Sequence, residues 1–242
     1  MTRRRHLLIG GAAATGAAVA GGGAAAFRLH AAPRRGPYLT EAHLAALRSA
    51  ELPRPRVLFV GNSMVLRNDL ADRVADRALA DGVALSTAVA SANGARLVET
   101  VRLSGFRAVL RRDWDAVVVQ DFTKTPLRGI DRWGSARAVG LIARTAAPAP
   151  LLLYPPNPAR GDNAVYRDAG FLTAEPSSPR DFADRAMSHY GSLGHRVVPV
   201  PHSWIDAAEA GAPLYEEDGH HPSPAGTDLI AGLIWTELAA LL

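Results

Sequence analysis

The chain has 242 residues, 48% of them hydrophobic and only 6% aromatic, which fits one domain of helices packed on a buried sheet. It contains no cysteine, so disulfides, thiolate nucleophiles and cysteine-ligated zinc are excluded together. The formal charge is +4, with arginines scattered along the chain and Lys124 as the only lysine, a distribution that does not indicate nucleic-acid binding. Any chemistry is therefore expected from hydroxyl, imidazole and carboxylate groups.

Residues 1–26 have the features of an export signal. Three arginines, Arg3 to Arg5, precede an apolar stretch rich in glycine and alanine, a pattern similar to twin-arginine signals, and the small residues at 24–26 suit a signal peptidase. Cleavage there would leave one more basic than acidic residue. The apolar run is nearly long enough to span a bilayer, so a retained N-terminal membrane anchor is the alternative. In both cases the domain is expected outside the cytoplasm, as a secreted, cell-surface or periplasmic protein.

Residues 27–55 are predicted to form a linker and a short helix from 41 to 50, which Pro53 and Pro55 close. The main domain follows, from 56 to 242. Apolar runs typical of strands occur at 56–60, 83–90, 115–120, 151–154 and 195–200. Helical patterns occur at 69–80, 97–111, 135–146, 181–193, 204–210 and 224–242. The alternation predicts an α/β fold, a three-layer α/β/α sandwich with a five-stranded parallel sheet.

Ser63 follows the first of these strands, in VLFVGNSM. This position is at the carboxyl edge of the predicted sheet, where the functional groups of parallel sheets usually lie. A serine nucleophile needs an imidazole as base, a carboxylate to hold the imidazole, and donors for the oxyanion. GNS by itself is also typical of a plain turn or a helix cap.

The segment DGHHPSPAG, just before the last helix, supplies the other two groups. Asp218 lies three residues ahead of His221, so in a turn its carboxylate can accept from Nδ1 of the imidazole while Nε2 faces the serine. Two alternatives stay open. One is a solvated turn, and the other is a metal site built from Asp218, His220 and His221.

Together these blocks resemble those of the SGNH (GDSL-like) hydrolases. GNSM stands in the place of GDSL, a glycine-containing loop follows the second strand, a polar residue follows the third, and DxxHP precedes the last helix. The resemblance is closest to the branch whose first block is GNS and whose third block is a hydrophobic strand ending in glutamine. It implies the flavodoxin-like SGNH fold and a catalytic triad of Ser63, Asp218 and His221.

The resemblance also implies an oxyanion hole made by the N–H of Ser63, the N–H of Gly94 and the side chain of Gln120, where the family usually has asparagine. Asn62 is expected to hydrogen-bond the loops around the site. The candidate polar contacts on the substrate side are Asn62, Asn93, Asp121, Thr123 and Tyr154. The long loop 155–179, together with Tyr154, Tyr166 and Phe171, is a candidate substrate rim.

The expected function is therefore an exported serine esterase acting on carboxylic esters, such as O-acetyl groups on carbohydrate or short-chain lipid esters, without metal or cofactor. Its partner is a small-molecule or glycan ester. Two alternatives remain: a catalytically silent module that binds a glycan or protein partner, and an O-acyltransferase. Paired carboxylates among Asp162, Asp168 and Glu175, as in glycosidases, are a weaker reading because their loop offers no rigid framework. The oligomeric state is not defined by the sequence.

Overall fold

The computed structural model describes residues 28–30, 39–167 and 175–242, so the predicted export signal lies outside the described residues. Within them the strands form one parallel sheet in the order β1-β3-β2-β4-β5-β6. The strands are β1 (Arg28–His30), β2 (Arg56–Gly61), β3 (Ser86–Ser91), β4 (Ala116–Val119), β5 (Leu151–Leu153) and β6 (Arg196–Val197).

The five predicted strands are all present, as β2 to β6. Their spatial order, with β2 counted first, is 2-1-3-4-5, the flavodoxin-like order. The short strand β1 was not predicted: it falls in the segment expected to be a linker and pairs with the edge of β3, with Arg28 opposite Thr87. A three-residue strand is too short to show a periodic pattern, and its pairing is decided by β3 rather than by its own sequence.

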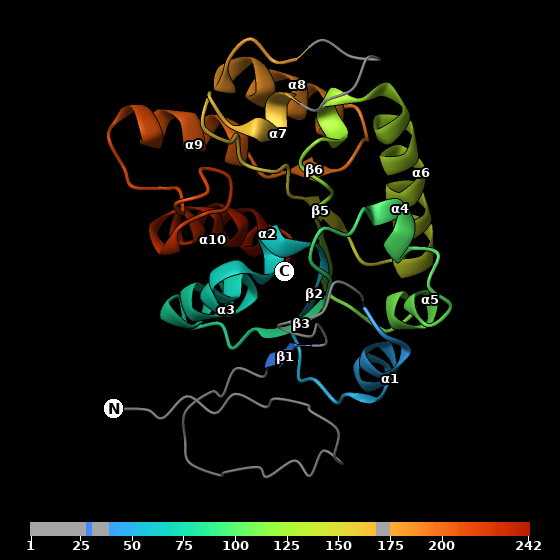
Figure 1. Cartoon of the computed structure of the whole chain (residues 1–242). Helices are drawn as coiled ribbons and strands as arrows, with labels where there is room; N and C mark the ends of the chain where they lie inside the picture. Colours follow the sequence, from blue (N-terminus) through green and yellow to red (C-terminus); the bar gives the residue numbers. More distant parts are fainter. Residues whose placement is uncertain (1–27, 31–38, 168–174) are drawn as a thin grey trace.

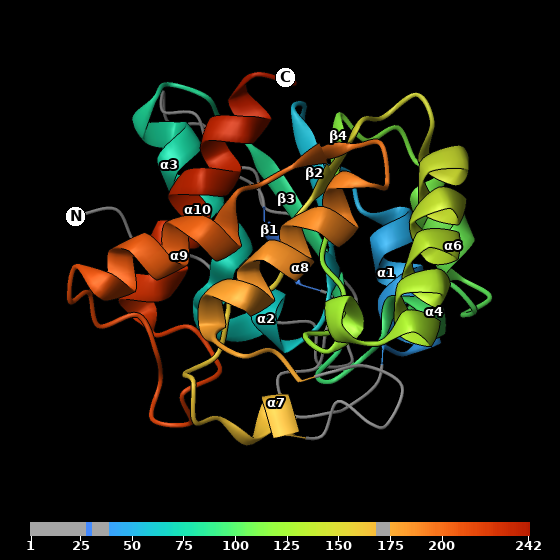
Figure 2. The same cartoon turned by 90° about the horizontal axis from the view of Figure 1, so that it is seen from above.

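Helices cover both faces of the sheet, which gives the three layers seen in Figures 1 and 2. The helices are α1 (Glu41–Ser49), α2 (Ser63–Leu66), α3 (Leu70–Ala80), α4 (Leu97–Thr100), α5 (Phe106–Leu110), α6 (Gly129–Ala146), α7 (Ala164–Arg167), α8 (Pro179–Gly191), α9 (Val200–Glu209) and α10 (Pro224–Ala239), with 3-10 turns η1 (Arg67–Asp69) and η2 (Thr125–Leu127). Among the described residues no helix combines the length and the apolarity needed to cross a membrane.

Each face of the sheet has its own hydrophobic core. Along β2, Leu58 and Val60 pack under α1, α5 and α6, whereas Val57 and Phe59 pack under α3, α9 and α10. Successive side chains of a strand point to opposite faces, so an uninterrupted apolar run is what a sheet covered on both sides requires. Fully burying each such side chain is worth roughly 1.5–3 kcal/mol.

Two predicted helices begin earlier than expected, α6 at Gly129 and α9 at Val200, and a third is interrupted. The pattern over 97–111 forms two short helices, α4 and α5, separated by turns. The break lies at Gly105, whose N–H donates to Glu41 Oε1 at 3.2 Å, while Ser104 Oγ donates to the same oxygen at 2.7 Å. A Cβ on Gly105 would lie 2.5 Å from Glu41 Oε2. The carboxylate of α1 therefore lies where a longer helix would continue.

Candidate active site

Ser63 lies where the strand order of the sheet reverses. β2 is the central strand, with β3 on one side and β4 on the other, and the chain leaves β2 at its carboxyl end directly into α2. In open α/β sheets the crevice outside the carboxyl ends at such a switch point is the usual ligand site.

Asn62 sets the turn that presents Ser63. Its side-chain oxygen accepts the N–H of Met64 at 3.1 Å, which caps α2, and its Nδ2 donates to the carbonyl of Ala95 at 3.2 Å. These two bonds are the loop contacts expected of Asn62, and its side chain is only 3% exposed, which corrects the expectation that it also contacts substrate. Ser63 is the first helical residue, a position whose N–H has no partner within the helix.

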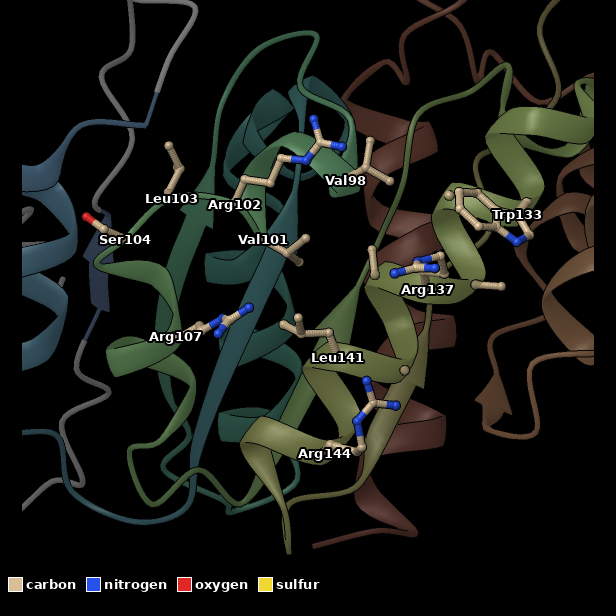
Figure 3. A pocket seen from close by; sticks show the side chains of 14 residues that line it. Val98, Val101, Arg102, Leu103, Ser104, Arg107, Trp133, Arg137, Leu141 and Arg144 are labelled. Carbon is tan, nitrogen blue, oxygen red and sulfur yellow. The ribbon is translucent and has the colours of Figure 1, made fainter.

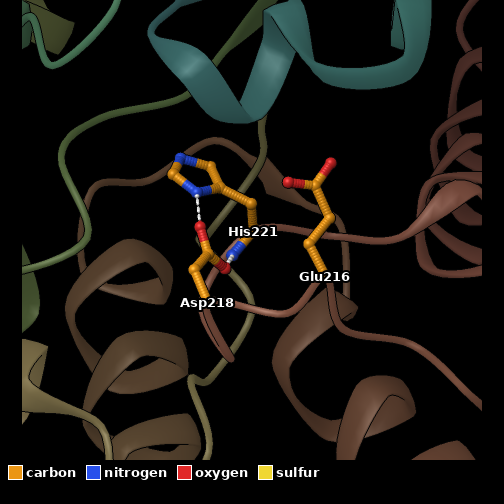
Figure 4. A group of neighbouring side chains, drawn as sticks. All are labelled: Glu216, Asp218 and His221. Atoms are coloured by element: carbon orange, nitrogen blue, oxygen red, sulfur yellow. Dashed lines mark hydrogen bonds and ion pairs between the residues drawn. The ribbon is translucent and has the colours of Figure 1, made fainter.

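Ser63, His221 and Asp218 form one hydrogen-bonded chain. Ser63 Oγ and His221 Nε2 are 3.0 Å apart, and His221 Nδ1 and Asp218 Oδ2 are 2.5 Å apart. Asp218 Oδ1 also accepts the backbone N–H groups of His220 and His221, each at 2.9 Å, and Figure 4 shows the two bonds between Asp218 and His221. Partial burial alone would raise the pKa of Asp218, but the bonds from the His221 side chain and from the two N–H groups outweigh it and bring that pKa well below its usual value. The carboxylate therefore stays ionised beside the imidazole.

The loop that carries Asp218 and His221 is held by the loop after β5. The carbonyl oxygens of three consecutive residues, 218 to 220, accept in turn from Asn163 Nδ2 at 2.7 Å, from the Arg160 N–H at 2.9 Å and from Asn157 Nδ2 at 3.2 Å. Residues 155–159 are buried. This part of the predicted substrate rim therefore supports the loop that carries Asp218 and His221.

A second connection joins the segment after Ser63 to the segment around His221. Asn68 Nδ2 donates to the carbonyl of Pro222 at 2.9 Å and to Thr227 Oγ1 at 3.0 Å. Next to it, Arg67 forms an ion pair with Glu216 at 3.0 Å. Asn68 has a left-handed backbone with φ 51°, a conformation that asparagine tolerates better than most residues. Sequence reasoning missed Asn68, whose signal is an asparagine directly before the helical pattern of 69–80.

Gln120 does not have the role expected from the family pattern. Its Oε1 accepts the N–H of Asn62 at 3.1 Å, its Nε2 donates to the carbonyl of Asp121, and the residue is fully buried. Both ends of the amide are therefore used inside the protein, and the expectation of a side-chain oxyanion donor is corrected. The extra methylene of glutamine, compared with asparagine, lets the amide reach back under the Asn62 turn.

Gly94 and Asn93 are exposed in the turn after β3. Gly94 has φ +68°, and a Cβ there would meet no atom within 4 Å. Glycine is thus required by the backbone conformation and not by crowding. Because Asn62 bonds to the next residue, Ala95, this turn is fixed to the one that presents Ser63.

The other candidate substrate contacts are buried. Asp121, Thr123 and Tyr154 are 3%, 4% and 0% exposed, which corrects the expectation that they line the substrate side. Asp121 Oδ1 accepts the N–H groups of Leu97 and Phe122, and burial raises its pKa despite these bonds. Of the rim aromatics, Tyr166 is also buried and donates to the carbonyl of Ala159, while Phe171 lies outside the described residues.

His220 packs edge-on against His221, with ring centroids 4.7 Å apart. Burial, and then the neighbouring His221, lower the pKa of His220 to about 4. A neutral imidazole next to His221 adds no competing charge near neutral pH. Among the described residues, the imidazole nitrogen within hydrogen-bonding distance of Ser63 Oγ is Nε2 of His221.

The residues that could bind a metal differ from the expected set of Asp218, His220 and His221. Ligand atoms of Glu216, Asp218 and His221 lie within 4.8 Å of one another, and Figure 4 shows Glu216 beside the other two. His220 is not part of this group. The ring nitrogens of His221 already face Asp218 and Ser63, so a bound cation would have to replace one of these hydrogen bonds.

Comparisons with known proteins agree with this architecture. No protein-family model matches the sequence, and a search of curated proteins finds no significant match. Among solved structures, a protein from Slackia heliotrinireducens assigned to the SGNH hydrolases is 26% identical, with a TM-score of 0.63 over 76% of this chain and 98% of that chain.

Two further structures share the fold at lower identity. A protein from Parabacteroides merdae named a GDSL-like lipase is 17% identical, with a TM-score of 0.55 over 77% of this chain and 96% of that chain. An acetylxylan esterase from Geobacillus stearothermophilus is 13% identical, with a TM-score of 0.56 over 76% and 94%. The sheet order and the likeness to the Slackia protein over nearly its whole length place the chain in the SGNH (GDSL-like) hydrolase superfamily.

Proposed function

We propose that the protein is a serine esterase that hydrolyses carboxylic esters through an acyl-enzyme. The observation that carries this proposal is the hydrogen-bonded chain from Ser63 Oγ through His221 to Asp218. A module that only binds a ligand has no need for a hydroxyl, an imidazole and a carboxylate in this order.

His221 acts as the general base in the proposed reaction. Its Nε2 takes the proton of Ser63 while Oγ attacks the ester carbonyl, and Asp218 stabilises the imidazolium that forms. His221 then returns the proton to the leaving alcohol. The backbone N–H groups of Ser63 and Gly94 are the proposed oxyanion donors, and water attacking the acyl-enzyme completes hydrolysis.

The proposed substrates are O-acetyl groups on carbohydrate or short-chain lipid esters. The structural likeness to an acetylxylan esterase and to a GDSL-like lipase supports both classes. Export is proposed from the arginines and the apolar run of residues 1–26, and cell fractionation of the full chain with and without these residues tests it. Recovery of the full chain in the cytoplasm would contradict export.

The experiment for catalysis is labelling of the full chain with a serine-reactive phosphonate, with the adduct located by mass spectrometry. We expect a single adduct at Ser63 that is lost in His221→Ala. The matched control is His202→Ala, because His202 Nε2 is also paired with an aspartate, Asp184, at 2.9 Å but belongs to α9 and has no hydrogen bond to Ser63 among the described residues. A folded protein that takes no label and does not cleave aryl acetates would overturn the proposal in favour of a binding module.

Acyl transfer is separated from hydrolysis by the products. The same triad serves both reactions, so incubation of an aryl acetate with the protein and a sugar alcohol in water distinguishes them. Free acetate as the main product supports the esterase. Acetylated sugar as the main product identifies a transferase.

A further inference from the structure

A groove of about 730 Å³ runs between the α4–α5 segment and α6, outside the triad (Figure 3). Four arginines line it: Arg102, Arg107, Arg137 and Arg144. No carboxylate is among the lining residues. The charged side chains that line the groove are therefore all positive.

The acidic side chains of α4 and α6 are engaged elsewhere, and Glu41 of α1 accepts the hydroxyl of Ser104, which is a lining residue. Glu99 of α4 accepts the backbone N–H of Arg96 at 3.0 Å, and Asp131 of α6 pairs with Arg96 and Arg128. In the part of the chain that the structure describes, none of the four groove arginines forms an ion pair. Guanidinium groups gathered without counter-charge around a hollow favour an anion that lies between them.

The groove also has an apolar side. Val98, Val101 and Leu141 line it, and Trp133 at its end is 63% exposed. The guanidinium of Arg137 lies 4.7 Å from the Trp133 ring centroid, which holds the indole in place. An exposed indole beside a hollow offers a flat apolar face of the kind on which a sugar ring can stack.

Two glycines of α6 line the groove. A Cβ on Gly134 would lie 2.9 Å from Val98 Cγ1, so glycine allows the two helices to approach at this end. The second, Gly140, lies further along α6.

The end of the groove at Val98 and Trp133 is directed toward the candidate active site. α4 follows β3, and α6 follows β4 after η2, so both helices begin near the carboxyl edge of the sheet where Ser63 lies. An extended polymer can therefore lie in the groove with a neighbouring unit close to that edge.

We propose that this groove binds an acidic polysaccharide, with ring carboxylates on the arginines and a sugar ring on Trp133. The proposal rests on the proposed esterase function in one respect: it names the substrate class of that site as an ester-bearing polymer of uronic acids. A hollow between two helices, with its charges along the walls, fits a chain better than the flat surface of a membrane.

The test is calorimetric titration of the full-length Ser63→Ala protein with oligogalacturonate, and with a neutral xylo-oligosaccharide of equal length. We expect the acidic oligomer to bind more tightly, and its affinity to fall as salt rises. Arg137→Gln and Arg102→Gln should each weaken binding by about tenfold. Arg111→Gln, which removes the same charge from an exposed position outside the groove, is the control and should bind as the parent does.

Equal binding of the two oligomers, or equal loss in the groove and control variants, would overturn the proposal. So would arginine-dependent binding to anionic phospholipid vesicles without binding to the oligomer. Phosphonate labelling of the wild-type chain separates the two proposals. Labelling at Ser63 without oligomer binding removes only the groove proposal, whereas oligomer binding without labelling removes only the esterase.

Discussion

A Cβ placed on Gly61 would lie 2.7 Å from Gln120 Oε1, so the glycine two residues before Ser63 leaves the space that this buried amide fills. The same oxygen accepts the N–H of Asn62. Gln120, the residue that follows β4, therefore fixes the turn after β2 that presents Ser63.

This contact predicts a coupled pair of substitutions. Gly61→Ala should lower the free energy of unfolding by about 1–3 kcal/mol, because the methyl group meets Gln120 and also Val65 Cγ2 at 2.7 Å. Gln120→Ala removes one of the two obstacles, so the double variant should be more stable than the sum of the single losses predicts. Urea unfolding of all four proteins measures this coupling, and strictly additive losses would contradict it.

Asn68 is predicted to hold the two halves of the triad together. Asn68→Gly keeps the left-handed backbone but loses both side-chain hydrogen bonds, at a cost of about 1–2 kcal/mol. Asn68→Ala loses the bonds and adds backbone strain of roughly 1 kcal/mol. Both variants should also cleave aryl acetates more slowly, since Pro222 adjoins His221. Equal stability of the two variants would show that the backbone at this position is not strained.

Gly226 and Gly232 lie in the same helix, α10, and should respond oppositely to alanine. A Cβ on Gly226 would lie 2.3 Å from the carbonyl of Leu214, which accepts the N–H of Ser223, so Gly226→Ala should displace the segment that carries His221. We expect a loss of about 2 kcal/mol or more in stability together with lower activity. At Gly232 the nearest atom is Arg77 Cζ at 3.4 Å, so Gly232→Ala should stabilise the helix by roughly 0.5–1 kcal/mol. Thermal unfolding of both variants decides this.

His189 should make stability depend on pH. Burial, and then the charge of Arg132, lower the pKa of His189 to about 4, below the value of 6.5 for a free imidazole. Between these values the unfolded chain binds a proton that the folded chain does not, so stability present above pH 6.5 is lost as the pH falls toward 4. The loss is on the order of 3 kcal/mol.

His189→Phe should reduce this dependence in urea unfolding at pH 7 and pH 4.5. His202→Phe, at a histidine whose side chain is 42% exposed, is the control and should retain it. If the free energy of unfolding of His189→Phe depends on pH as strongly as that of the parent, other groups control acid unfolding.

Substitutions of Asp218 and Glu216 distinguish a catalytic triad from a metal site. In a triad, Asp218→Asn should lower kcat by about 10³–10⁴-fold, while Glu216→Gln, which only loses its pair with Arg67, should cost less than about tenfold. In a metal site both carboxylates are ligands, so both changes should be severe, and dialysis against a chelator should abolish activity. Activity of the two variants on an aryl acetate, with and without chelator, gives the answer.

The sequence by itself determined the layered fold and the order of its strands along the chain, because uninterrupted apolar runs separated by helical patterns have few ways to be buried. It also indicated Ser63, Asp218 and His221, since DxxH in a turn and a serine at a strand end carry their chemistry in residue type and spacing. The 3.0 Å contact between Ser63 and His221 joins residues 158 positions apart in the chain.

Only the tertiary structure decided the direction of each polar side chain at the strand ends. Gln120, Asp121, Thr123 and Tyr154 follow strands, as substrate-binding residues do, yet all four are buried. Position in the chain places a residue at the sheet edge, but whether its side chain faces substrate or backbone depends on which unpaired N–H and C=O groups the neighbouring loops present. Those loops come from distant parts of the sequence, so no local pattern records the outcome.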